Sequence, residues 1–471
     1  MARPLRRRAS LSFLNGLKTL IFYVTLLLSL LCCAGTGREG IAEEELFLDI
    51  LRDEAVDRIY QLGKVSDADN YLERTFLSPA SMRAGNLIQK WMEDAGLKTW
   101  VDYMGNVHGR VGGVNATAEA LLIGSHMDTV IDAGMYDGSL GIICAVSALK
   151  VLKVSGKLGK LSRPVEVIAF SDEEGVRFQT TFLGSAAMAG ILPATALKIT
   201  DKSGISVQDA LLENSFEATE ESFAKVKYDP DSVFGYVEVH IEQGPVLESL
   251  AYPLGVVKGI AGQTRLKVTV EGSQGHAGTV PMFMRRDPMV AASDLIVLLE
   301  SLCKHPQNFL SYDEQYEGIP TESFAALVYF TVDIRAMDDT TREAIILEFS
   351  HRVKEKCQIR RVNCTIEHKH NAKAAYCDKE LSLQLQQAVH SAVSKTPWSI
   401  QEDVPTLMSG AGHDAMAISH LTRVDILYSV GMLFVRCRGG VSHSPAEHVL
   451  DDDIWAAGLA LLQFLEKNVL Y

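Results

Sequence analysis

Short apolar runs alternate with longer amphipathic stretches between residues 119 and 190. Residues 120–125 and 165–170 are nearly continuous in apolar side chains, whereas residues 138–153 place apolar side chains at helical spacing. Continuous apolar runs are typical of parallel strands that helices cover on both sides. We therefore predict an α/β domain with a mixed, largely parallel sheet and helices on both of its faces.

The pattern changes near residue 260, where residues 264–271 alternate apolar and polar side chains as a half-buried strand does. Helix-like and strand-like stretches follow at 288–303, 324–336, 340–359 and 362–368. This order predicts a smaller α+β unit of the ferredoxin-like (split βαβ) kind, although only one convincing strand separates its two helices. The predicted boundaries are 44–258 for the first part of the larger domain, 259–374 for the inserted unit and 375–471 for the second part.

The first 37 residues have the composition of a targeting segment. A basic cluster at residues 6–8 precedes an apolar stretch at 20–34, and small residues follow. This order predicts a secretory signal peptide, whereas an uncleaved leader would be a signal anchor and the chain's only contact with a membrane. We therefore expect the secretory pathway, and within it the endoplasmic reticulum.

The remaining composition narrows the partners and the chemistry. The 471-residue chain has a net charge of −14, which disfavours nucleic acid as a partner. Two Asn-x-Thr sequons, at Asn115 and Asn363, fit the secretory route. The cysteines form no Cys-x-x-Cys pair, so a thiolate zinc site is disfavoured. Disulfides are compatible with that route, but the sequence does not reveal their pairing.

Candidate metal ligands follow the first apolar run. His126 and Asp128 lie two residues apart at its end, and Asp137 lies just before the next predicted helix. Positions i and i+2 of a strand share a face, so His126 can bind a metal ion while Asp128 holds its other ring nitrogen. Asp137 can offer its carboxylate oxygens to two ions. A buried His–Asp pair without a metal is the alternative for this stretch alone.

Four downstream residues extend this set. Glu173 and Glu174 follow the second apolar run, His240 lies in a short β-type run, and His443 lies in a loop rich in turn formers. Of the adjacent glutamates, one can bind a metal while the other moves a proton at the substrate. Taken alone, these residues also fit a charged loop, a core histidine and a solvated histidine. Together with the ligands above they form a nitrogen- and oxygen-donor set that suits Zn²⁺ or Mn²⁺ and leaves positions open for water.

The inserted unit contributes two further candidates. His276 lies in a glycine-flanked loop and could polarise a carbonyl or stabilise an oxyanion. Arg335, at a strand end, could hold a carboxylate through two hydrogen bonds. A surface histidine and a salt bridge from Arg335 to Asp333 or Asp338 are the competing interpretations.

Five motifs carry a family resemblance. They are Gly-Ser-His-Met-Asp-Thr at 124–129, Ser-Asp-Glu-Glu-Gly at 171–175, His-Ile-Glu-Gln-Gly-Pro at 240–245, Gly-His-Ala-Gly-Thr at 275–279 and Ser-His-Ser-Pro at 442–445. In these motifs the chain resembles the plant allantoate amidohydrolases (allantoate deiminases), a group within the aminoacylase-like di-metal amidohydrolases. The resemblance implies that the larger domain is catalytic and that the inserted unit is a lid and dimerisation domain.

The resemblance also implies a metal site of two divalent cations per subunit. His126 and His240 would hold one cation, Glu174 and His443 the other, and Asp137 would lie between them. Mn²⁺ is the expected metal and Zn²⁺ the alternative.

The expected reaction is hydrolysis of one ureido group of allantoate, a small anion, to ureidoglycine, ammonia and carbon dioxide. Glu173 would be the general base and later the general acid, and Asp128 would support the site. His276 would reach the active site of the partner in a homodimer. The implied substrate contacts are Gln243, His276, Arg335, Gly412 and His413.

Two departures from the family pattern bear on this expectation. A segment that family members carry before residues 330–335, with an asparagine that contacts substrate, is missing, and residues 425–430 look like a short insertion. These changes affect the lid more than the ligands, all of which remain. The alternatives are therefore an amidohydrolase acting on ureidoglycolate or an N-carbamoyl amino acid, or a metal-binding but inactive isoform.

Overall fold

The computed structural model describes residues 44–276, 278–306, 328–396, 402–421 and 430–470. The predicted leader, most of the junction left by the missing segment and most of the predicted insertion lie outside these residues. Within the described ranges, no helix combines the length and the apolar content needed to cross a membrane.

The larger domain is built on one mixed sheet with the strand order β1-β2-β4-β3-β5-β12-β6-β10, and β11 pairs with β6. Its strands are β1 (Lys98–Val101), β2 (Val107–Val111), β3 (Ala120–His126), β4 (Val165–Phe170), β5 (Val233–Ile241), β6 (Leu254–Ile260), β10 (Ala375–Tyr376), β11 (Thr406–Ser409) and β12 (Val430–Val435). The central strands β4, β3, β5 and β12 are parallel to one another. The flanking strands β2 and β6 run antiparallel to them. The predicted mixed sheet is confirmed, and its parallel part is the centre.

Helices cover both faces of this sheet. They are η1 (Asp49–Asp53), α2 (Glu54–Gly63), α3 (Pro79–Asp94), α4 (Ser139–Val154), α5 (Leu183–Ala189), α6 (Val207–Glu213), α7 (Glu220–Val226), α8 (Val246–Ser249), α11 (Lys379–Val393), α12 (Asp414–Ile418) and α13 (Asp451–Asn468). On one face, Met92 of α3 lies against Gly109 of β2, and Gly141 of α4 lies against Val239 of β5. On the other face, α12 contacts β5 and β12, and α5 contacts α12.

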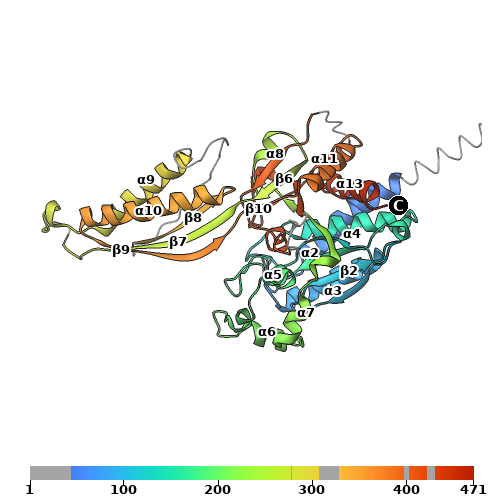
Figure 1. Cartoon of the computed structure of the whole chain (residues 1–471), viewed down its shortest axis with the longest axis horizontal. Helices are drawn as coiled ribbons and strands as arrows, with labels where there is room; N and C mark the ends of the chain where they lie inside the picture. The colour runs from blue at the N-terminus through green and yellow to red at the C-terminus, as the bar shows by residue number, and fades with distance from the viewer. Residues whose placement is uncertain (1–43, 277, 307–327, 397–401, 422–429, 471) are drawn as a thin grey trace, which may run out of the picture.

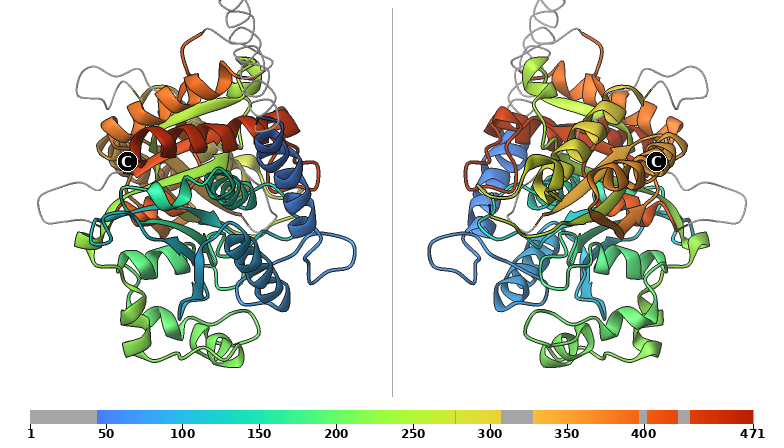
Figure 2. Two further views of the ribbon diagram at one scale, coloured as in Figure 1. Left: turned by 90° about the vertical axis from the view of Figure 1, so that its right-hand side faces the viewer. Right: turned by 90° about the vertical axis from the view of Figure 1, so that its left-hand side faces the viewer.

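The C-terminal helix α13 lies at the end of the larger domain that is remote from the inserted unit. In the left view of Figure 2, α13 lies beside the N-terminal helices, and its contacts are with η1, α2, α4 and α11. The first and last helices of the larger domain therefore pack together in one continuous hydrophobic core, although most of the sequence separates them.

The inserted unit, named the lid after its predicted role, extends from the larger domain (Figure 1). Its elements are β7 (Gly262–Glu271), α9 (Pro288–Lys304), β8 (Tyr329–Ala336), α10 (Asp339–Arg360) and β9 (Asn363–Ala372). β7 is the middle strand and is antiparallel to both neighbours. Leu266, Val268 and Val270 alternate along β7 and pack with the helices in a core of their own. In the described part of the lid, β8 is the one strand between the two helices, which agrees with the sequence pattern.

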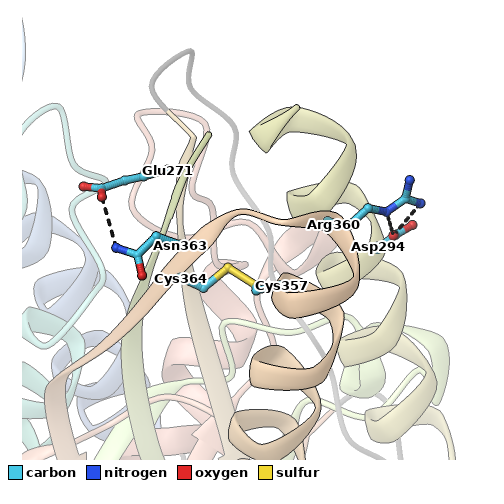
Figure 3. Close-up of a disulfide and its surroundings, with 6 residues drawn as sticks. All are labelled: Glu271, Asp294, Cys357, Arg360, Asn363 and Cys364. Atoms are coloured by element: carbon cyan, nitrogen blue, oxygen red, sulfur yellow. Dashed lines mark hydrogen bonds and ion pairs between the residues drawn. A yellow bond between two sulfur atoms is a disulfide. The ribbon is translucent and has the colours of Figure 1, made fainter. Parts of the chain in front are cut away.

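A disulfide joins two lid elements that adjoin in sequence. Cys357, in the last turns of α10, is bonded to Cys364, near the start of β9 (Figure 3). Beside it, Arg360 forms an ion pair with Asp294 at 2.7 Å, which ties α10 to α9. The disulfide therefore closes the helix-to-strand turn at a place where the sequence did not indicate which cysteines pair.

Candidate functional site

The central parallel strands bring the predicted ligands to one edge of the sheet. His126 is the last residue of β3, Glu174 follows β4, His240 is near the end of β5, and His443 follows β12. Phe170 of β4 is paired in register with His126, and Phe434 of β12 with His240. Carboxyl ends of parallel strands meet at one edge, where open α/β sheets form their sites. Residues that are far apart in sequence therefore converge here.

Asp137 is the residue that touches both halves of the cluster. Its Oδ1 lies 3.3 Å from His126 Nε2 and 2.9 Å from His240 Nε2. Its Oδ2 lies 3.3 Å from His443 Nε2, which in turn lies 3.2 Å from Glu174 Oε1. His126, Asp137 and His240 are buried, whereas the His443 side chain is 49% exposed. One group of candidate ligands is thus His126, Asp137 and His240, and the other is Asp137, Glu174 and His443.

The hydrogen bonds of the two buried imidazoles show that this donor set fits a cation. His126 Nδ1 lies 3.1 Å from the backbone oxygen of Asp128, and His240 Nδ1 lies 2.9 Å from that of Ile241. A carbonyl oxygen only accepts, so each Nδ1 carries a proton and each Nε2 can present its lone pair. The two Nε2 atoms, 3.3 Å apart, both face the Asp137 carboxylate. Each Nε2 can therefore carry a proton or bind a cation beside the carboxylate, and the three donors together fit a divalent cation.

The pKa shifts show that the same groups attract positive charge. Burial opposes ionisation of Asp137, but the charge of His240 and hydrogen bonds from the surrounding imidazoles hold its pKa well below the usual range. Burial also opposes a charged His126, yet hydrogen bonds with Asp128 and Asp137 raise its pKa well above the usual range. The surroundings therefore favour an anionic Asp137 with positive charge beside it.

Asp128 contacts His126 and also the segment after β4. Its Oδ1 lies 3.6 Å from His126 Nδ1, so the ring nitrogen is closer to the backbone oxygen of Asp128 than to its carboxylate. The carboxylate instead accepts the backbone N–H groups of Glu173 at 3.0 Å and Glu174 at 3.2 Å. The chain turns sharply at Asp172, where φ is +56°. Beyond this turn, the Asp128 carboxylate holds the segment that follows β4 to the end of β3.

Glu173 lies beside the ligands in a buried position. One of its carboxylate oxygens lies within 4.8 Å of ligand atoms of His126 and Glu174. Burial, opposed by the charge of His126, raises the pKa of Glu173 well above the usual range. Of the two adjacent glutamates, Glu174 is the one that contacts His443, which leaves Glu173 free to face a substrate.

Gln243 and His413 lie at the cluster, and Gly412 precedes His413 in the chain. Gln243 Nε2 donates to Asp137 Oδ2 at 2.8 Å. The buried His413 ring packs edge-on against His240 with centroids 4.4 Å apart, and its Nε2 lies 2.7 Å from Ser409 Oγ. Burial and the charge of His240 lower the pKa of His413 well below the usual range, so His413 is a neutral wall of the site.

The two lid candidates are placed differently. Arg335 forms an ion pair with Asp333 at 2.9 Å, as the competing interpretation predicts, and also donates to the backbone oxygen of Gly410 at 2.6 Å. Arg335 thereby ties the lid to the loop that leads into Gly412 and His413. His276 is exposed in the loop after β7, where it accepts the backbone N–H of Gly278 at 3.1 Å. The described residues show no contact between His276 and the cluster of its own chain.

Sequence reasoning assigned no role to two residues that touch this site. Ser442 Oγ lies 2.7 Å from Asp137 Oδ2, and Glu447 accepts the backbone N–H of Asp137 at 3.1 Å. Both lie in the loop with His443, which looked like a solvent-exposed turn. The sequence did offer one signal of such a role, the acidic residue directly after the Ser-His-Ser-Pro-Ala run. A charged side chain in such a loop can hold a metal ligand in place instead of facing water.

Comparison with known proteins adds family and substrate information. Residues 122–467 match the model of peptidase family M20/M25/M40. The chain is 66% identical to allantoate deiminase 2 of Glycine max over 90% of this chain and 91% of that protein. It is 62% identical to allantoate deiminase of Arabidopsis thaliana over 92% and 86% of the two chains. An N-carbamoyl-L-amino-acid amidohydrolase of a Pseudomonas strain is 33% identical over 88% and 97%.

A solved structure shares the fold over most of the chain. The crystal structure of AtUAH in complex with glyoxylate aligns with a TM-score of 0.73 at 27% identity and covers 88% of this chain and 97% of that one. The part of this chain that the alignment leaves out is much shorter than either domain. The alignment therefore includes most of the larger domain and most of the inserted unit.

Proposed function

The chain belongs to peptidase family M20/M25/M40 and to its allantoate deiminases, and we propose that it hydrolyses one ureido group of allantoate at the cluster around Asp137. The observation that carries this proposal is the convergence of three imidazoles and two carboxylates from four parallel strands, with Glu173 beside them. Twofold higher identity to allantoate deiminases than to the carbamoyl-amino-acid enzyme supports allantoate over that alternative substrate.

Different residues of this chain have different roles in the proposed reaction. Two divalent cations, held by His126 and His240 on one side and by Glu174 and His443 on the other, would polarise the ureido carbonyl and lower the pKa of a water. Glu173 takes the proton of the attacking water at its carboxylate and returns it to the departing nitrogen. Carbamate leaves and decomposes to ammonia and carbon dioxide, and ureidoglycine remains.

Other side chains orient the participants. Asp128 fixes the backbone of Glu173 and Glu174, so that one carboxylate faces substrate while its neighbour faces a cation. Gln243, whose amide donates to Asp137, and Arg335, at the edge of the lid, would contact a small anion. The neutral His413 closes the site behind His240 and keeps positive charge away from that wall.

The test combines metal removal with a choice of substrates. We expect the purified protein to lose ammonia release from allantoate after chelation and to regain it with Mn²⁺ more fully than with Zn²⁺. Ureidoglycolate and an N-carbamoyl amino acid serve as the competing substrates in the same assay. Rapid turnover of either of them, with allantoate left intact, would contradict the substrate assignment; turnover that survives chelation would contradict the metal site.

We extend the proposal to assembly and location. A homodimer through the lid gives the exposed His276 a function, because in this chain it lies apart from its own cluster. Residence in the endoplasmic reticulum is supported by the leader pattern and by the lid disulfide, since disulfides persist in oxidising compartments. A lid shortened before β8 remains the basis for the alternative, a metal-binding but inactive isoform, and dimer formation is the property that separates the two.

A further inference from the structure

Glu447 lies behind the turn that carries Asp137. Its side chain is buried, with 5% of its surface exposed. Its Oε1 accepts hydrogen bonds from the backbone N–H groups of Tyr136 at 2.8 Å and Asp137 at 3.1 Å. The two N–H groups precede α4 and have no strand or helix partner, so this carboxylate fixes the direction in which Asp137 points.

The other oxygen of Glu447 reaches the loop that carries His443. Glu447 Oε2 lies 3.1 Å from the hydroxyl of Ser442, the residue before His443. The same hydroxyl lies 2.7 Å from Asp137 Oδ2, so Ser442 sits between the two carboxylates. Its single proton serves one carboxylate at a time, and with either one the bond ties the loop of His443 to the turn of Asp137.

The turn and the glutamate fit each other closely. A Cβ added at Gly134 would lie 2.3 Å from Glu447 Cβ and 2.4 Å from its Oε1. Nonbonded carbon atoms do not approach so closely, so the turn can lie this near to Glu447 only because residue 134 has no side chain. The close approach is an observation independent of the hydrogen bonds, and it points to the same contact.

We propose that Glu447 is a positioning residue that holds Asp137 and His443 at the separation at which both groups of ligands can share Asp137. The inference rests on the metal site of the proposed function and goes beyond it, because Glu447 contacts neither group's ligand atoms. Groups that hold metal ligands in place typically contribute about 10- to 100-fold to metal affinity. The effect falls mainly on the cation of Glu174 and His443, since His443 is half exposed and lies outside the strands and helices.

The experiment measures Mn²⁺ binding by titration calorimetry on metal-free protein with the substitutions Glu447→Ala, Glu447→Gln and Glu447→Asp. We expect Glu447→Ala to weaken the second Mn²⁺ by about 10- to 100-fold and the first by less. Glu447→Gln should recover most of that affinity, because its amide oxygen can accept the same two backbone N–H groups. Glu447→Asp should not, because its carboxylate is one methylene shorter.

A neighbouring glutamate provides the matched control. Glu242 is buried and also accepts two backbone N–H groups, from Val246 at 2.8 Å and Leu247 at 3.0 Å, but these belong to α8. Glu242→Ala should lower the melting temperature of metal-free protein about as much as Glu447→Ala while leaving both Mn²⁺ affinities within about threefold of wild type. Equal Mn²⁺ affinity in wild type and Glu447→Ala, or an equal loss in Glu242→Ala, would overturn the proposal.

Steady-state kinetics separates this inference from the proposed function. At saturating Mn²⁺ we expect Glu447→Ala to recover most of its kcat for allantoate with little change in KM, because the reacting groups are unchanged. A wild type that binds two Mn²⁺ ions but leaves allantoate intact would contradict the proposed substrate alone, since the Mn²⁺ affinities still decide the role of Glu447. A kcat that stays low at saturating Mn²⁺ would count against a purely positioning role.

Discussion

Asp128 and Asp137 both follow β3, but their carboxylates do different things. The sequence predicted both as parts of one site because residues at the end of a buried parallel strand face the edge where sites form. It could not predict which oxygen each neighbour uses, because that depends on the backbone beyond the strand. The carboxylate of Asp128 accepts the backbone N–H groups of Glu173 and Glu174, and its backbone oxygen is the closer partner of His126.

Substitution should distinguish the roles of the two adjacent glutamates, Glu173 and Glu174. We expect Glu173→Gln to lower kcat by about 10²- to 10⁴-fold while the protein still binds two Mn²⁺ ions, since the proposed mechanism gives Glu173 a proton-transfer role and not a ligand role. Glu174→Gln should instead weaken Mn²⁺ binding, because Glu174 contacts His443 on the ligand side. Ammonia release and metal analysis of dialysed protein provide the two measurements. Loss of Mn²⁺ from Glu173→Gln, with Glu174→Gln unaffected, would reverse the assignment.

His108 allows a pH test away from the metal ligands. It is buried between Asp102 at 3.2 Å and Glu166 at 2.9 Å. Burial alone would lower its pKa, but hydrogen bonds with these carboxylates raise it to about 9. Because the folded protein holds this proton more tightly than the unfolded chain, the stabilisation is complete below the unfolded pKa of about 6.5 and is lost as the pH rises through 9.

We therefore expect the stability difference between wild type and His108→Gln to shrink by at most about 3 kcal/mol between pH 6.5 and 9.5. Trp100 stacks on His108 with centroids 4.8 Å apart, so tryptophan fluorescence can follow unfolding. The comparison with His108→Gln removes contributions from titrating groups that His108 does not contact. A difference that stays constant or grows over this range would contradict the assignment of a charged His108.

At the scale of elements, periodicity predicted the lid better than its cross-link. The alternation of Leu266, Val268 and Val270 identified β7 because one face of that strand is buried in the lid core. Cysteine pairing has no such signal, since it depends on how α10 is placed against β9. The short helices α6 and α7 were also missed, although each begins with a capping box, at Ser206 and Thr219.

The disulfide should stabilise the lid. The double substitution Cys357→Ala and Cys364→Ala removes a short closed loop, for which the chain-entropy model gives about 2 to 3 kcal/mol. We expect faster hydrogen exchange in α10 and β9 and a melting temperature that no longer responds to reductant. Cys303→Ala is the control, because Cys303 is a free thiol partly buried against the same lid core. Free thiols at 357 and 364 in protein recovered from the endoplasmic reticulum would contradict the bond.

At the scale of the whole molecule, the larger domain positions the candidate metal ligands, whereas the lid holds His276 away from them. Four neighbouring strands carry the candidate metal ligands. That these strands are parallel could be predicted from the sequence, since alternating strands and helices favour a parallel sheet. The position of the lid could not be predicted, because only the connections between β6 and β7 and between β9 and β10 join it to the larger domain. The contact of Arg335 with Gly410 adds a side-chain link between the two domains.

The separation of His276 from its own cluster leads to a complementation test. If His276 acts in the partner's site, His276→Ala and Glu173→Gln homodimers should each be nearly inactive. A mixed dimer has one site with an intact Glu173 that receives His276 from the other subunit. Equal mixing with free exchange should therefore restore about a quarter of wild-type allantoate hydrolysis, because half of the dimers are mixed and each has one competent site. Glu173→Gln mixed with the Glu173→Gln and His276→Ala double variant is the control that should stay inactive. Mixed dimers verified by mass that recover no activity would exclude a role for His276 across the interface, and a monomeric wild type would favour the isoform with an incomplete lid.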